Sequence, residues 1–165
     1  PVTRERKERR SMDDPTGRGD GPPPPRSGTD RARLALVVDD ESQTRHALVR
    51  ILTDLGFSCV EADTAEEALS LLADCTPCIG VFDIAMPGIG GAELAWRIRQ
   101  GDAAFPLIAV SGNLHVWDED DLKDLGFSYV MSKPFDVADF LATCERAVED
   151  ARRQRPSEPP GEGAT

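Results

Sequence analysis

Five residues of this sequence carry side chains that together could bind and transfer a phosphoryl group: Asp39, Asp40, Asp83, Ser111 and Lys133. Three carboxylates brought together repel one another, so a site that holds them needs positive charge. Lys133 would supply one charge, and Mg²⁺, a small cation that prefers oxygen ligands, would supply two more. One carboxylate could then act as the nucleophile, while Lys133, Ser111 and the metal stabilise charge on the phosphoryl oxygens.

These side chains can converge only if the elements before them deliver them to one edge of a sheet. Short runs rich in apolar residues predict strands at residues 34–38, 57–61, 79–82, 107–110 and 127–131. Uninterrupted apolar runs such as Leu34–Val38 are typical of parallel strands that are covered on both faces. In an open parallel sheet, ligands bind outside the carboxyl ends of the strands. We therefore expect the ends of the first, third, fourth and fifth strands to form one site.

Helices are expected between and after these strands, at residues 43–54, 64–73, 92–100, 116–124 and 136–151. Their apolar residues recur at helical spacing, and Thr64 with Glu67 has the form of a capping box at the start of the second helix. We expect Trp96 to lie on the buried face of the third helix. The strict alternation predicts an α/β fold, a doubly wound five-stranded parallel sheet with five helices.

The folded part of the chain is expected to span residues 33–151. The composition of residues 1–32 and 152–165 predicts a disordered N-terminal segment and a disordered tail. Met12 could be the natural start, which leaves open whether residues 1–11 are native. The residues after the last helix contain no helix-turn-helix and no ATP-binding segment, which favours a stand-alone protein, with a fragment of a larger protein as the alternative.

The folded part is strongly acidic. Residues 34–150 carry 7 Lys and Arg against 22 Asp and Glu, a net charge of −15. This charge disfavours direct binding to the phosphate backbone of nucleic acids. The sequence has no run of 18 apolar residues that could span a membrane, and its N-terminus lacks the apolar stretch of a secretory signal. We therefore expect a cytoplasmic protein.

The four cysteines do not form a metal-binding pattern. Cys75 and Cys78 have the CxxC spacing, but no second pair of ligands with matching spacing accompanies them. A redox CxxC would normally open a helix, whereas this one precedes an apolar run. We therefore interpret the pair as small residues at a junction between a helix and a strand, and we expect no disulfides.

Four motifs of the chain resemble those of response regulator receiver domains, the receiving half of two-component phosphorelays. They are Val37–Glu41, Phe82–Gly91, Ala109–Gly112 and Ser132–Phe135, and each lies at the end of a predicted strand. Each motif alone is a weak signal, whereas four in the right order are a strong one. The resemblance covers about residues 34–150. It implies a flavodoxin-like sheet with strand order 2-1-3-4-5, and a stand-alone protein similar to the chemotaxis response regulators.

The resemblance also assigns metal ligands by position. Asp83 matches the aspartate that is phosphorylated in the family. Asp40, with Asp39 beside it, matches the acidic pair that holds Mg²⁺ together with Asp83. The backbone carbonyl of Ala85 matches a further ligand of the metal.

The residues that would contact the phosphoryl group follow from the same resemblance. Ser111 matches the hydroxyl that moves toward this group on activation, with Gly112 beside it. Lys133 matches the invariant lysine of the family, and its bond to Pro134 is cis in relatives. Together with Ala85, these residues form the expected phosphate-binding set.

The chain departs from the family pattern at Val130. Relatives commonly have Tyr or Phe three residues before the lysine, and that ring moves inward with the hydroxyl. Tyr129 is one residue away, and strand alternation points it to the other face of the sheet. The change of surface that follows phosphorylation therefore needs another route, such as loop ordering after Ser111 or movement of Trp117.

The resemblance implies two kinds of partner. A histidine kinase or a histidine phosphotransfer protein would donate the phosphoryl group, and a downstream protein target would bind the fourth helix, fifth strand and fifth helix. The chain would catalyse only its own phosphorylation and dephosphorylation, so we do not expect an enzyme in the ordinary sense.

Three alternatives remain open. The first is a phosphatase with an aspartyl nucleophile, but such enzymes carry two aspartates two residues apart, whereas Asp39 and Asp40 are adjacent. The second is a receiver cut from a hybrid histidine kinase. The third is a degenerate receiver that binds partners without phosphorylation, for which Val130 is the supporting feature.

Overall fold

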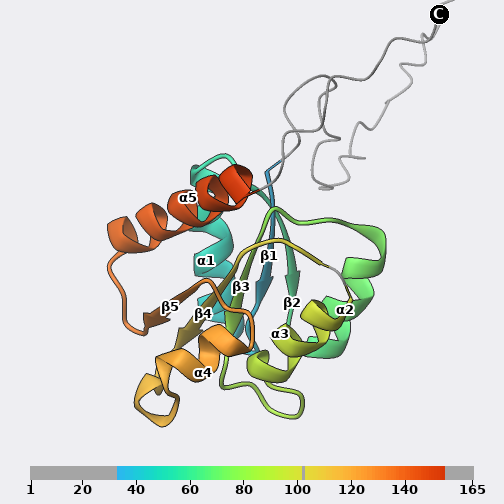
Figure 1. Cartoon of the computed structure of the whole chain (residues 1–165). Helices are drawn as coiled ribbons and strands as arrows, with labels where there is room; N and C mark the ends of the chain where they lie inside the picture. Colours follow the sequence, from blue (N-terminus) through green and yellow to red (C-terminus); the bar gives the residue numbers. More distant parts are fainter. Residues whose placement is uncertain (1–32, 102, 155–165) are drawn as a thin grey trace, which may run out of the picture.

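The computed structural model describes residues 33–101 and 103–154, and these form alternating strands and helices (Figure 1). In chain order the elements are β1 (Leu34–Val38), α1 (Ser42–Asp54), β2 (Ser58–Ala62), α2 (Ala65–Asp74), β3 (Ile79–Asp83), α3 (Gly91–Gln100), β4 (Leu107–Ser111), the 3-10 helix η1 (Leu114–Val116), α4 (Glu119–Asp124), β5 (Tyr129–Ser132) and α5 (Val137–Gln154). The segments 1–32 and 155–165 lie outside the described residues, so the structure does not test the expectation that they are disordered. The tail does not begin at residue 152 as predicted, because α5 continues through Gln154.

The five strands form one parallel sheet with the order β2-β1-β3-β4-β5. Each strand of the sheet pairs in parallel with its neighbour, as Val38 of β1 does with Ala62 of β2 and with Phe82 of β3. The doubly wound α/β fold and the strand order 2-1-3-4-5 are therefore confirmed. All five strands point the same way, so their carboxyl ends lie along one edge of the sheet.

Two apolar layers cover the faces of the sheet. On one face, alternate strand residues such as Val37 and Val81 pack with Leu52 of α1 and Phe140 of α5. On the other face, the intervening strand residues pack with side chains of α2, α3 and α4. The central strands β1, β3 and β4 are buried on both faces, which explains their continuous apolar sequences. The core thus occupies both sides of the sheet and leaves the strand ends for polar residues.

The capping box before α2 forms with one change. The Thr64 hydroxyl accepts a hydrogen bond from the Glu67 backbone N–H at 3.2 Å, as the motif predicts. The Glu67 carboxylate accepts a bond from the N–H of Asp63 at 3.0 Å, one residue before the cap. Both interactions satisfy backbone donors at the start of the helix.

The helix expected at residues 116–124 is shorter and interrupted. The chain forms the 3-10 helix Leu114–Val116, and the α-helix begins only at Glu119, after Asp118 caps it by accepting the N–H of Asp120 at 3.0 Å. An aspartate whose side chain binds the backbone two residues on favours a cap over a helix interior. Leu122 is the buried residue of this short helix.

The expectation that Trp96 lies in the core is wrong, because the residue is 51% exposed. The buried residues of α3 are Gly91, Ala92, Leu94, Ala95 and Ile98, and all except Ala92 lie at the spacing of one helical stripe. Trp96 follows Ala95 by one residue, a rotation of about 100° around the helix. The Trp96 ring therefore points away from the buried face of α3.

The described helices have no segment that is both long and apolar enough to span a membrane.

The two positions on α3 predict different effects of truncation. Leu94→Ala should lower the free energy of unfolding by about 2–5 kcal/mol, because the fully buried side chain leaves a cavity. Trp96→Ala should lower it by less than about 1 kcal/mol, because half of the side chain is already in water. Urea denaturation of the two variants measures the difference, and equal losses would contradict the placement of Trp96.

Candidate functional site

The side chains of Asp39, Asp83 and Lys133 meet at the carboxyl edge of the sheet. Asp39 follows β1, Asp83 ends β3, and Lys133 follows β5. The ammonium of Lys133 lies 2.8 Å from Oδ2 of Asp39 and 3.0 Å from Oδ2 of Asp83. Asp40 completes the cluster, since one carboxylate oxygen from each of the three aspartates lies within 4.8 Å of the others.

Asp39 is a fully buried carboxylate. Its Oδ1 accepts a hydrogen bond from the backbone N–H of Glu41 at 2.9 Å, and its Oδ2 accepts the bond from Lys133. A buried charge is tolerated only when it is paired and hydrogen-bonded. The pairing with Lys133 therefore offsets the cost of burying Asp39 directly after β1.

Lys133 is the cation of the cluster. Burial by itself would lower the pKa of this amine, but the hydrogen bonds to Asp39 and Asp83 outweigh it and raise the pKa above the usual lysine value. The ammonium form therefore persists at neutral pH. The backbone N–H of Lys133 donates to the carbonyl oxygen of Ser111 at 2.8 Å, which continues the pairing of β5 with β4. The bond between Lys133 and Pro134 is cis, as expected.

Asp83 is held by the turn that it begins. Its Oδ1 accepts a hydrogen bond from the N–H of Ala85 at 2.9 Å, and Ala85 itself is exposed. The first residue of α3, Gly91, packs against the backbone at Asp83, and a Cβ there would collide with the Asp83 carbonyl oxygen. The close approach of α3 to Asp83 therefore requires glycine at this position.

Ser111 ends β4 and is fully buried. Its hydroxyl oxygen accepts a hydrogen bond from the N–H of Asn113 at 3.1 Å. A hydroxyl that accepts one bond still has its own hydrogen to donate. Next to it, Gly112 faces open space, because a Cβ built there would meet no atom within 4 Å. The end of β4 thus places the hydrogen-bonded hydroxyl of Ser111 beside the accessible backbone of Gly112.

The donor set fits a hard divalent cation. All three grouped side chains, those of Asp39, Asp40 and Asp83, offer carboxylate oxygens, which Mg²⁺ and Ca²⁺ prefer over nitrogen or sulfur ligands. Asp40 is exposed, so a cation there could retain water molecules, as Mg²⁺ usually does. One lysine cannot neutralise three carboxylates, which leaves charge for a cation to compensate.

Val130 faces the side of the sheet that is covered by α4, whereas Tyr129 faces α5. Val130 packs against the apolar layer formed with α2, α3 and α4, and the Tyr129 hydroxyl lies 2.6 Å from Oδ2 of Asp150, a residue of α5. The predicted alternation is therefore confirmed. A small hollow beside Val130 is lined by Leu114, Trp117 and Leu122, so Trp117 borders the space next to this side chain.

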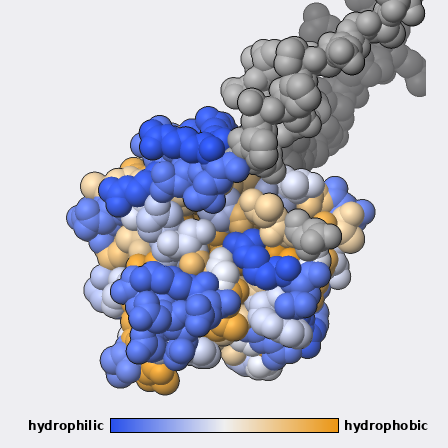
Figure 2. All heavy atoms as spheres, in the orientation of Figure 1, coloured by the Kyte–Doolittle hydropathy of each residue, from blue (hydrophilic) through white to orange (hydrophobic). Residues whose placement is uncertain are grey.

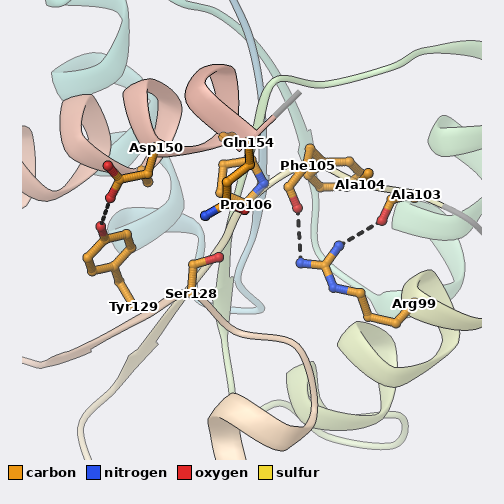
Figure 3. A pocket seen from close by; sticks show the side chains of 11 residues that line it. Arg99, Ala103, Ala104, Phe105, Pro106, Ser128, Tyr129, Asp150 and Gln154 are labelled. Atoms are coloured by element: carbon orange, nitrogen blue, oxygen red, sulfur yellow. Dashed lines mark hydrogen bonds between the residues drawn. The ribbon is translucent and has the colours of Figure 1, made fainter. Parts of the chain in front are cut away.

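A larger hollow lies at the opposite edge of the sheet (Figure 3). Pro106 and Ser128, which line it, precede β4 and β5, so it opens at the amino ends of these strands. The guanidinium of Arg99 points to backbone carbonyls and donates to Ala103 at 2.8 Å and Phe105 at 3.0 Å (Figure 3). This arginine therefore stabilises the chain before β4, and the hollow shares no residue with the carboxylate cluster.

The surface around α4 is acidic. Figure 2 shows hydrophilic residues over α4 and over the end of α5. The exposed carboxylates of α4 are Glu119, Asp120, Asp121 and Asp124. These carboxylates are spaced along one helix and are solvated. Part of the negative charge of the domain therefore lies on the surface of α4.

The cysteines lack the features of reactive thiols. All four are free, and Cys144 is fully buried. Burial raises the pKa of the Cys59 thiol to about 11 and that of Cys144 to about 12, and it also raises the pKa values of Cys75 and Cys78. Reactive cysteines have lowered pKa values, so these properties favour the structural interpretation of the CxxC pair.

Comparison with known proteins gives one family. A model of the response regulator receiver domain matches residues 35–145. The DNA-binding transcriptional regulator NtrC of Klebsiella pneumoniae is 31% identical over 122 residues, which are 74% of this chain and 26% of NtrC. The chain therefore spans about a quarter of the length of this curated relative.

Two solved structures illustrate the structural similarity. A response regulator receiver protein from Pseudomonas putida is 33% identical with a TM-score of 0.66, over 71% of this chain and 98% of that one. A CheY-like receiver domain protein from Methanospirillum hungatei has a TM-score of 0.69 at 21% identity, over 74% of this chain and 98% of that one. The second similarity shows the fold alone.

Lys133→Met should destabilise the protein in the absence of divalent cations. The buried Asp39 would lose its charged partner, so the free energy of unfolding should fall by roughly 1–3 kcal/mol. Lys123→Met is the matched control, because Lys123 forms exposed ion pairs on α4, which water screens, and its loss should change the free energy of unfolding much less than the loss of Lys133. Urea denaturation with a chelator present compares them, and equal effects would show that the Lys133 pairs do not stabilise the fold.

Proposed function

The chain belongs to the response regulator receiver domain family, and from this membership we propose that it accepts a phosphoryl group on Asp83 within a two-component phosphorelay. The receiver would occupy residues 33–151. Membership in this family implies a signalling protein with a kinase partner and a downstream target.

One observation carries the proposal: the side chain of Asp83 lies at a strand end between a lysine and two further carboxylates. Lys133 contacts it at 3.0 Å, and oxygens of Asp39 and Asp40 lie within 4.8 Å. The side chain of Asp83 is 11% exposed, so solvent reaches it, whereas that of Asp39 is at 0%. Of the two carboxylates that bind Lys133, Asp83 is thus the one that a phosphate donor could approach.

In the proposed reaction a carboxylate oxygen of Asp83 attacks the phosphorus of a phosphohistidine. A P–O bond forms and the P–N bond breaks, so the electron pair leaves on the imidazole nitrogen, which takes up a proton. The product is an acyl phosphate on Asp83. In such transfers the protein acts mainly by positioning the reactants and by stabilising charge on the three peripheral oxygens.

Asp39, Asp40, Asp83 and the backbone carbonyl of Ala85 are the proposed ligands of Mg²⁺. Their oxygen chemistry and the spacing of the three carboxylates support this assignment. When bound, the metal supplies positive charge that offsets the repulsion between the carboxylates and the incoming phosphoryl oxygens.

The remaining residues would stabilise the phosphoryl group after transfer. Lys133 already contacts Asp83 and can pair with a phosphoryl oxygen from the same side. The Ser111 hydroxyl and the backbone at Ala85 and Gly112 are the proposed hydrogen-bonding groups for the other oxygens. The open space beside Gly112 supports this role, because the added group needs room.

The proposed partners are a histidine kinase or histidine phosphotransfer protein as donor, and a downstream protein target. The target would bind α4, β5 and α5, a surface inferred by analogy with the family. We propose that the protein acts in the cytoplasm. The acidic charge of the domain gives no reason to propose direct contact with nucleic acid.

Asp83→Asn should abolish phosphorylation. Wild-type protein incubated with Mg²⁺ and a small acyl-phosphate donor should gain the mass of one phosphoryl group, because the carboxylate supplies the nucleophile. The variant should gain none in intact-mass spectrometry. Asp124→Asn, an exposed position on α4, is the matched control and should react like the wild type.

Two outcomes would contradict the proposal. The first is a wild-type protein that gains no mass and shows no Mg²⁺-dependent spectral change with beryllofluoride. The second is repeated turnover of a generic phosphate ester, which would instead indicate a phosphatase with an aspartyl nucleophile.

A further inference from the structure

Asp40 occupies an exposed position, yet its carboxylate has to face the same point as those of Asp39 and Asp83. Among residues 33–101 and 103–154, no side chain holds the Asp40 carboxylate through a hydrogen bond or an ion pair. Its direction therefore depends on the backbone around it. Hydrogen bonds made by the residues on either side, Asp39 and Glu41, hold that backbone.

The backbone before Asp40 is held at two atoms. The N–H of Asp39 donates to the carbonyl oxygen of Ala62 at 3.2 Å, which extends the pairing of β1 with β2. The carbonyl oxygen of Asp39, which belongs to the peptide group that enters Asp40, accepts a hydrogen bond from Nη1 of Arg45 at 2.7 Å. After Asp40, the N–H of Glu41 donates to Oδ1 of Asp39. Arg45 is thus the side chain that holds the peptide preceding Asp40.

Arg45 belongs to helix α1, and its side chain also contacts the loop after β1 and strand β2. Its backbone N–H donates to the carbonyl oxygen of Glu41 at 2.9 Å in the first turn of α1. Its Nε lies 3.2 Å from Oε2 of Glu61, a residue of β2. The side chain of Arg45 is only 13% exposed. The guanidinium therefore joins the loop after β1 to α1 and β2.

An arginine suits this place because its planar group donates along several fixed directions. One edge binds the carbonyl oxygen of Asp39 while Nε binds Glu61. A lysine ammonium carries the same charge as a point on a flexible chain and lacks this fixed fork. The geometry of the interaction, and not only its charge, therefore differs between the two residue types.

We propose that Arg45 is a positioning residue for the Mg²⁺ site, which orients Asp40 by holding the peptide between Asp39 and Asp40. This inference rests on the proposed function, since it concerns the metal site of that function. Residues that orient the ligands of a metal change its affinity when they are replaced, typically by 10-fold to 100-fold.

Positioning and simple electrostatics predict effects of opposite sign. The positive charge of Arg45 repels a cation, so the loss of that charge alone would strengthen Mg²⁺ binding. The loss of positioning would weaken it. Arg45→Met should therefore raise the dissociation constant for Mg²⁺ by about tenfold if the hydrogen bond to Asp39 orients the site.

The test is a titration of the full chain with MgCl₂, followed by the amide resonances of residues around Asp40 in ¹H–¹⁵N NMR spectra. Arg45→Met should bind Mg²⁺ about tenfold more weakly than the wild type, and Arg45→Lys should fall between the two. Arg50→Met is the matched control, because Arg50 is an exposed arginine of the same helix, and it should bind like the wild type.

Each outcome separates this inference from the proposed function. A wild-type protein that does not bind Mg²⁺ would overturn the proposed metal site itself. A wild-type protein that binds Mg²⁺, together with an Arg45→Met variant that binds as tightly or more tightly, would overturn the positioning role alone. If Arg45→Met does not fold, Arg45→Lys provides the test. A wild-type affinity for Mg²⁺ in this charge-conserving variant would show that the planar guanidinium is not needed, and would overturn the positioning role.

Discussion

The mutual repulsion of three carboxylates is the constraint on which the rest of this structure depends. Two unit charges about 4 Å apart repel by about 4 kcal/mol at the effective dielectric near a protein surface. Oxygens of Asp39, Asp40 and Asp83 all lie within 4.8 Å of one another, and Asp39 is fully buried. Such a cluster is stable only when positive charge lies beside it. Lys133 supplies one positive charge, and its ammonium lies 2.8 and 3.0 Å from the carboxylates of Asp39 and Asp83.

This constraint joins parts of the chain that are far apart. Lys133 and Asp39 are separated by 94 residues, and β3 and β4 lie between their strands in the sheet. The ion pairs therefore span the carboxyl edge from β1 to β5. Around them, smaller interactions hold the loops in place: Gly91 permits α3 to approach Asp83, and Arg45 holds the peptide before Asp40. The cluster thus depends on the close packing of loops as well as on strand ends.

The sequence predicted the regular elements better than their irregular connections. Continuous apolar runs place β1, β3 and β4 correctly because buried parallel strands need apolar residues on both faces. The region 116–124 was predicted less well, because its acidic residues have no clear period and Asp118 caps a helix where an uninterrupted one was expected. Trp96 shows a related limit. An apolar residue one position from the buried stripe has the composition of a core residue, and only the rotation of α3 places it in solvent.

The sequence by itself determined the α/β alternation, the residues at the strand ends and the family to which they belong, because these depend on residue type and order. Only the tertiary structure decided which atoms meet. The bridge from Lys133 to both Asp39 and Asp83, the space beside Val130 and the contact of Arg45 with the Asp39 carbonyl oxygen all arise between segments distant in sequence or from the exact course of a loop. No local pattern encodes such contacts, since they depend on the packing of helices and loops around the completed sheet.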